Sequence, residues 1–203
     1  IFKLRGIRGG KSASLQGLKE GFLKVLKHRD VLLAAALAFC TQYSFYTVTG
    51  WYPSILSMKG EPEAIASLLT LTFPSMPLAA FLSNKIGRRK PFLYLPCILQ
   101  ALLIQLIYYL GGAPLYAATI ALGVCFNVPF SFLFLLPTEL VDELLIGSAT
   151  GIILTVGYMG GILGPFISGV IRDFTMTFSW SFLITSIVIF SGGVLALFIR
   201  RVK

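Results

Sequence analysis

The stretch Asn84-Lys85-Ile86-Gly87-Arg88-Arg89-Lys90 decides the fold, because it separates two apolar runs that carry no charge. The runs are residues 64–82 before it and residues 91–110 after it. A helix needs about 20 apolar residues to cross the hydrocarbon core of a bilayer, and both runs meet that length. The basic stretch is therefore a short aqueous loop between two membrane-crossing helices. Because Lys and Arg in short loops stay on the cytoplasmic side, it also predicts the orientation of both helices.

The composition of the whole chain is that of a membrane protein. Hydrophobic residues make up 56% of the 203 residues and charged residues 12%, against about 45–50% and about 25% in soluble domains. The net charge of +9 comes from the segments between the apolar runs, which favours membrane topology over nucleic-acid binding. We therefore predict an all-α, polytopic membrane protein with no nucleic-acid partner.

The three cysteines, Cys40, Cys97 and Cys125, all lie inside apolar runs and follow no paired ligand spacing. A buried cysteine behaves as a small apolar residue, so we expect packing roles and no disulfide or metal site. No cluster of His, Asp and Cys residues stands at membrane depth. We therefore expect no cofactor and no enzymatic activity.

The apolar runs predict six transmembrane helices. Of the 17 Lys and Arg residues, all except Lys59 and Arg172 then fall in the N-terminal segment, the basic loop or the C-terminal end. The positive-inside rule therefore places both ends of this segment in the cytoplasm, and we expect a plasma-membrane location. The expected spans cover about 31–52, 64–82, 91–110, 114–136, 147–171 and 180–199.

Residues 1–30 precede the first span and form a basic, polar segment. Apolar residues recur in its second half at helical spacing between lysines, which predicts an amphipathic helix on the membrane surface. A solvated helical linker is the alternative. The chain begins at Ile1 and not at Met, so we expect that a segment precedes it, and whether the chain is a fragment stays open.

Polar side chains in two spans are candidate solute contacts. Gln42, Tyr46 and Thr49 lie at i, i+4 and i+7 and so share one face of the first span. Uncharged hydrogen-bonding groups at membrane depth line a cavity or bond to a neighbouring helix, and both interpretations remain open here. Asn127 in the fourth span has the same two interpretations.

Prolines and glycines predict the shapes of three spans. Pro53 is expected to end the first helix, and Pro74 and Pro77 are expected to bend the second. The fifth span is rich in glycines at a spacing of four, which favours close packing against a partner helix. A hinge at Gly164-Pro165 is the alternative. The residues concerned are Gly151, Gly160, Gly164, Pro165 and Gly169.

The loop resembles a known family motif. Residues Leu82-Ser83-Asn84-Lys85-Ile86-Gly87-Arg88-Arg89 are similar to the Gly-x-Leu-Ser-Asp-Arg-x-Gly-Arg-Arg loop of major facilitator superfamily (MFS) transporters, with Ala80 in place of Gly and Asn84 in place of Asp. The glycines of the fifth span resemble the family's antiporter pattern, Gly151-x8-Gly160-x3-Gly164-Pro165-x2-Ser168-Gly169, with Ser168 in place of Gly. In the family that pattern marks the fifth helix of the whole transporter, so it does not establish antiport here.

The resemblance implies that this chain is the C-terminal six-helix half of a transporter, paired with an N-terminal half in the same chain or in a separate one. Such a transporter moves a small solute by rocking its halves around a central site, as a symporter or an antiporter. The gating loop would comprise Asn84, Lys85, Gly87, Arg88 and Arg89. The cavity candidates would be Gln42, Tyr46, Thr49 and Asn127, followed by Thr155 and Tyr158.

No Asp, Glu, Lys, Arg or His residue lies within the core of any expected span. The solute is therefore neutral or amphipathic, or its counter-charge and the coupling ion depend on the other half. The acidic loop 137–143, with Glu139, Asp142 and Glu143, is expected to contact the basic loops. Other functions with the same hydropathy are a six-helix channel, a membrane scaffold protein and a homodimeric half-size transporter.

Overall fold

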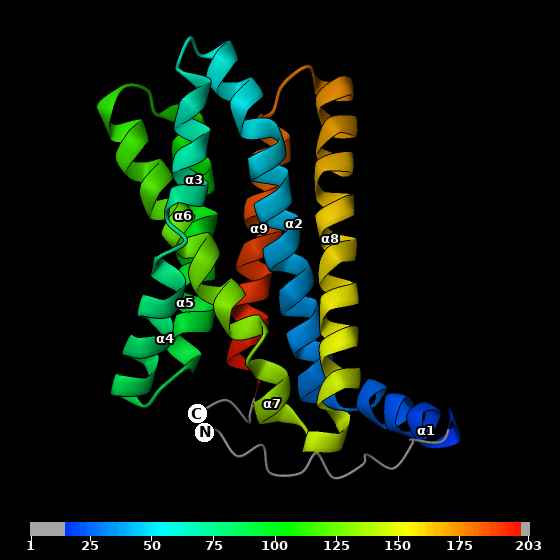
Figure 1. Cartoon of the computed structure of the whole chain (residues 1–203). Helices are drawn as coiled ribbons and strands as arrows, with labels where there is room; N and C mark the ends of the chain where they lie inside the picture. Colours follow the sequence, from blue (N-terminus) through cyan, green and yellow to red (C-terminus); the bar gives the residue numbers. More distant parts are fainter. Residues whose placement is uncertain (1–14, 200–203) are drawn as a thin grey trace, which may run out of the picture.

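The computed structural model describes the backbone of residues 15–199 and the side chains of residues 21–199. Within this part the chain is helical and contains no strand, so the predicted all-α class is confirmed (Figure 1). Six of its helical stretches are long and apolar enough to cross a membrane. The elements are α1 Leu15–Leu26, α2 Arg29–Met58, η1 Glu63–Ser67, α3 Leu68–Leu71, α4 Ser75–Ile86, α5 Lys90–Tyr109, α6 Ala113–Leu133, α7 Leu136–Leu140, η2 Glu143–Leu145, α8 Ile146–Thr175 and α9 Ser179–Leu197.

The bundle is organised around α2. This helix packs mainly against α8 and α9, while α5 packs against α6 and α9. At 30 residues, α2 is about 45 Å long, which exceeds the roughly 30 Å of bilayer hydrocarbon. The helix therefore extends beyond the hydrocarbon at one end or both, or tilts within it.

The second span is broken near its middle, and the loop after the fourth span is partly helical. The second is interrupted between α3 and α4 around Pro74, the residue expected to bend it, while Pro77 lies in the first turn of α4, where no backbone N–H is needed. The expected loop 137–143 is partly helical, because Leu136–Leu140 forms α7. A proline near a helix start is favourable, and Pro137 occupies that position.

The expectation that Pro53 ends the first helix is wrong. The residue lies inside α2, which continues to Met58. A proline in a helix removes one backbone hydrogen bond and crowds the preceding turn. Here these effects fall near the end of the helix, close to the solvent-exposed residues at its terminus, so the last turns of α2 still form.

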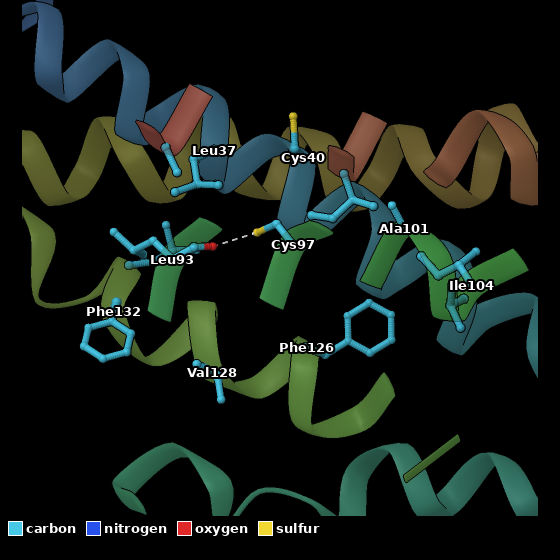
Figure 2. Packing of buried hydrophobic residues seen from close by; sticks show 14 of the residues in the cluster. Leu37, Cys40, Leu93, Cys97, Ala101, Ile104, Phe126, Val128 and Phe132 are labelled. Carbon is cyan, nitrogen blue, oxygen red and sulfur yellow. Dashed lines mark hydrogen bonds between the residues drawn. The ribbon is translucent and has the colours of Figure 1, made fainter. Parts of the chain in front are cut away.

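The centre of the bundle is apolar and tightly packed. Figure 2 shows Cys97 of α5 between Leu37 and Cys40 of α2 and Phe126 of α6. The Cys97 thiol is fully buried and donates to the Leu93 carbonyl, with the sulfur 3.1 Å from the oxygen. All three cysteines are free and buried, in agreement with packing roles.

Helix α8 approaches α2 through two of its glycines. A Cβ atom on Gly160 would lie 2.3 Å from the Phe39 carbonyl oxygen, and one on Gly164 would lie 2.6 Å from the Tyr43 carbonyl oxygen. These are backbone atoms that cannot move aside, so only glycine permits this contact. Gly151, in contrast, has no neighbour within 4 Å of such an atom.

The Gly164-Pro165 segment lies within a continuous helix, since α8 extends from Ile146 to Thr175. The Trp51 indole N–H donates to the Pro165 carbonyl at 3.0 Å, and Gly169 lies beside the same indole ring. The segment proposed as a hinge is therefore attached to α2 at this point.

The predicted amphipathic helix corresponds to α1, while residues 1–14 and the basic C-terminal residues 200–203 lie outside the described residues. Helix α1 lies across the end of the bundle where α7 and the basic loop are found (Figure 1). Val25 is buried, whereas Phe22, Leu23 and Leu26 are exposed. Among the described side chains of α1, Val25 therefore faces the bundle and the other three form an exposed apolar face.

Candidate functional site

A cavity of about 110 Å³ lies between α2, α4 and α6. It contains no charged residue, and its walls combine aromatic rings with a few uncharged polar groups. Its lining is Thr41, Gln42, Phe45 and Tyr46 of α2, Phe73 and Met76 at and after the break before α4, and Phe126, Asn127 and Phe130 of α6.

Gln42 supplies an unpaired amide to the cavity. Its side chain is only 4% exposed, and the structure gives its amide no hydrogen-bond partner among the described residues. The amide therefore faces the cavity with its N–H donors and its carbonyl acceptor available to a solute. The helical register places Tyr46 one turn further along the same face.

Asn127 has a structural role and also lines the cavity. Its amide nitrogen donates to Thr72 Oγ1 at 2.8 Å and to the Gly123 carbonyl at 2.9 Å. A carboxamide nitrogen has two hydrogens, so both are used, and the carboxamide oxygen remains free to accept. The bond to Thr72 attaches α6 to the break between α3 and α4.

The other predicted cavity residues lie elsewhere. Thr49 donates to the Phe45 carbonyl within α2 at 2.8 Å and does not line the cavity. Thr155 and Tyr158 are exposed on α8, outside the cavity lining. The structure thus brings Gln42, Tyr46 and Asn127 together in the cavity lining. The other three candidates, Thr49, Thr155 and Tyr158, lie outside it.

Sequence reasoning missed the aromatic walls of the cavity. Phe45 contacts Phe126 edge to face, with ring centroids 5.4 Å apart, and Tyr46 in the same geometry at 5.3 Å. In a chain this apolar, a phenylalanine that lines a cavity has the same local sequence signal as one that faces lipid. Only the path of the three helices distinguishes them.

The basic loop is held by defined contacts. Gly87 ends α4 with a φ of 70°, which a glycine adopts without strain. The Arg89 guanidinium donates to Asn84 Oδ1 at 3.0 Å and forms an ion pair with Glu139 of α7. Lys90 donates to the Leu197 carbonyl of α9 at 3.2 Å. The expected contact between the acidic segment and the basic loop is thus present at Glu139.

The remaining cations of the loop are exposed. Lys85 and Arg88 form no ion pair within the part of the chain that the structure describes, and neither do Asp142 and Glu143. Among the described residues, no group of His, Cys, Asp and Glu side chains could hold a metal ion.

Comparison with models of known protein families gives no match. Individual proteins are similar over most of the chain or over part of it. An uncharacterized protein of Archaeoglobus fulgidus is 30% identical over 93% of this chain, which spans 84% of that protein. The hexuronate transporter of Bacillus subtilis is 26% identical over 95% of this chain. Mouse monocarboxylate transporter 11 is 40% identical over 40% of this chain.

The chain spans 50% of the hexuronate transporter and 18% of the mouse protein. Both named relatives are MFS-type transporters. The six membrane-length helices and the basic loop between α4 and α5 agree with one half of that architecture. The chain therefore belongs to the major facilitator superfamily of membrane transporters.

Proposed function

We propose that this chain is the C-terminal six-helix half of a secondary active transporter that moves a small solute across the plasma membrane by alternating access. In that arrangement the cavity between α2, α4 and α6 forms one wall of a central site, and an N-terminal half forms the other. The observation that carries the proposal is the unpartnered Gln42 amide in this cavity.

The uncharged lining suits a site that binds a solute reversibly. Its polar groups are uncharged, so a solute can bind and leave without exchanging strong ionic contacts. A coupling ion carried by Asp, Glu, Lys, Arg or His requires such a residue at membrane depth, and the lining of this cavity includes none of them. We therefore place the proton or ion carrier in the other half.

The Arg89–Glu139 ion pair is proposed as part of the cytoplasmic gate. It joins the loop between α4 and α5 to α7, which immediately follows the cavity helix α6. A change in the tilt of α6 would alter this contact. In the proposed cycle, Asn84, Lys85, Gly87, Arg88 and Arg89 form the moving loop, with the termini of this segment on the same cytoplasmic side.

The relatives suggest which solutes to test first. Their names refer to a hexuronate and to monocarboxylates, so small organic acids and their neutral analogues form the first panel. Uptake would be measured in proteoliposomes that contain the protein as it occurs in its native membrane. Saturable uptake with accelerated counterflow is expected, whereas a current or flux that never saturates would contradict transport by alternating access.

Gln42→Ala provides the site-specific test. The change is expected to reduce saturable uptake by about tenfold or more, because one hydrogen bond to the solute is lost. Gln105→Ala is the matched control, since Gln105 donates to Ser186 between α5 and α9, outside the cavity lining. Equal loss of uptake in both variants, or loss of folded protein in Gln42→Ala alone, would assign Gln42 to packing.

One observation favours a second arrangement. The chain spans 84% of the Archaeoglobus protein, so a relative of nearly this size exists. Two six-helix chains could then form the two walls of the site as a homodimer. Native mass spectrometry of the protein extracted from its own membrane tests this. Two copies of a polypeptide near 22.2 kDa support the homodimer, and a single polypeptide about twice that mass contradicts it.

A further inference from the structure

The cavity wall has a composition that selects for one solute chemistry. We infer that the solute binds this half through a flat ring that carries an uncharged amide or hydroxyl group, and that any carboxylate on the solute points away from this wall. The inference rests on the proposed transport function and specifies the class of its substrate.

The ring is inferred from the walls. Phe45 and Phe126 lie edge to face across the α2–α6 contact, and rings at Phe73 and Phe130 complete the lining on the α4 and α6 sides. Aromatic side chains bind flat rings by stacking and edge contacts. An apolar cavity of about 150 Å³ is known to hold one benzene molecule. The cavity here, at about 110 Å³, can therefore hold much of a single ring.

The amide or hydroxyl group is inferred from the free hydrogen-bonding atoms. Gln42 supplies both a donor and an acceptor, and Asn127 supplies only its carboxamide oxygen, because its two N–H groups are used. The Thr41 hydroxyl donates to carbonyls of its own helix and can only accept from a solute. A group with both donors and acceptors, such as a primary amide, matches this set.

A carboxylate does not match the set. It only accepts hydrogen bonds, so it leaves the carboxamide oxygens of Gln42 and Asn127 without a donor, and the cavity lining holds no cation to pair with it. Moving a carboxylate from water to a site without a paired charge is strongly unfavourable. A solute that carries a carboxylate must therefore turn that group toward the other wall.

Benzamide and benzoate form a matched pair of probes, because they share the ring and differ only in this group. Their dissociation constants would be measured by equilibrium dialysis on the purified, full-length protein in detergent. Gln42→Met, which keeps the length of the side chain and removes its hydrogen bonds, is expected to weaken benzamide binding about tenfold. Benzoate binding should change by less than about twofold. Gln105→Met, outside the cavity, should change neither.

Tyr46→Phe is the second variant, and it keeps the ring of a side chain that is 38% exposed. If Gln42→Met does not fold, this variant tests the same wall, and a selective loss of benzamide affinity is expected. Unchanged benzamide affinity in the folded variants, or an equal loss for both probes, would overturn the inference. Absence of benzamide binding to the unmodified protein would overturn it as well.

Binding in detergent does not depend on transport, so the two proposals fail separately. Selective benzamide binding without saturable uptake of any solute in the panel would retain the inferred wall chemistry and contradict the proposed transport. Saturable uptake of acyclic acids by a protein that binds no benzamide would retain transport and contradict the inferred substrate class.

Discussion

Gln42 and Gln100 are the same residue type at membrane depth, and the structure gives them different roles. Gln100 is fully buried, donates to the Cys125 carbonyl at 2.7 Å and accepts from the Ser44 hydroxyl at 3.3 Å. It therefore joins α5 to α6 and α2. The Gln42 amide has no such partner and lines the cavity. The local sequence around a glutamine contains no signal for which role it takes.

We predict that Gln100→Met reduces stability and leaves solute affinity unchanged. Loss of its two interhelical bonds should lower the free energy of unfolding by about 1–2 kcal/mol, which is typical for buried polar contacts in membrane bundles. Thermal unfolding in detergent gives the stability, and equilibrium dialysis gives the affinity. A loss of affinity with unchanged stability would show that Gln100 belongs to the site.

The Arg89–Glu139 ion pair should contribute more to gating than to stability. The two side chains are 30% and 24% exposed, and ion pairs that water reaches are worth about 0.2–1 kcal/mol. In a double-mutant cycle, Arg89→Ala and Glu139→Ala should each change the uptake rate. The uptake rate of the double variant should change no more than that of either single variant. Glu143→Ala is the control, since Glu143 is exposed and has no ion pair in the described structure. Additive effects of the two changes would rule out a shared role.

At the scale of the elements, contacts between helix backbones determine the arrangement. Gly160 and Gly164 allow α8 to lie against the backbone of α2, and Gly192 and Gly193 allow α9 to lie against the Cβ atoms of Cys40 and Cys97. Small residues at helix crossings are effective in membranes because packing has to replace the hydrophobic driving force that lipid removes.

We predict opposite effects for two Gly→Ala changes on α8. Gly160→Ala places a methyl group 2.3 Å from the Phe39 carbonyl oxygen, so the helices must separate, with a loss of about 1–3 kcal/mol of stability. Gly151→Ala meets no atom within 4 Å and should be neutral or stabilise the helix by up to about 1 kcal/mol. Thermal unfolding of the two variants in one detergent measures the difference. Equal melting temperatures would contradict the assigned packing of α8.

At the scale of the whole molecule, charge is distributed between the two ends of the bundle. The basic loop, α7 and α1 share one end (Figure 1). Lys59 lies at the other end of α2 and donates to the Ile107 carbonyl near the end of α5 at 3.1 Å. Because the three native cysteines are buried, single introduced cysteines can report which end faces the cytoplasm.

We predict that Ala64→Cys is labelled in intact cells by a maleimide that does not cross membranes. Arg88→Cys should be labelled only after the cells are permeabilised, because the positive-inside rule places its loop in the cytoplasm. Both positions are exposed, so accessibility within the protein does not limit either reaction. The unmodified protein serves as the unlabelled control, and the reverse pattern would invert the proposed topology.

Sequence alone determined the class of the protein, the number of membrane-length helices and the resemblance of the basic loop to the MFS motif. These properties depend on the length and charge of continuous segments. The free energy of transferring a segment into a bilayer is close to a sum of contributions from its residues. The same local reasoning was wrong at Pro53, because whether a helix continues past a proline depends on what surrounds the freed carbonyl.

The tertiary structure decided which polar residues line the cavity and which join helices. It brought Gln42, Tyr46 and Asn127 together, placed Thr49 outside the lining and paired Arg89 with Glu139. These contacts join helices that are far apart in the sequence, so they depend on how the helices cross. The crossings in turn depend on close backbone approaches, such as the one at Gly160, whose geometry no single segment contains.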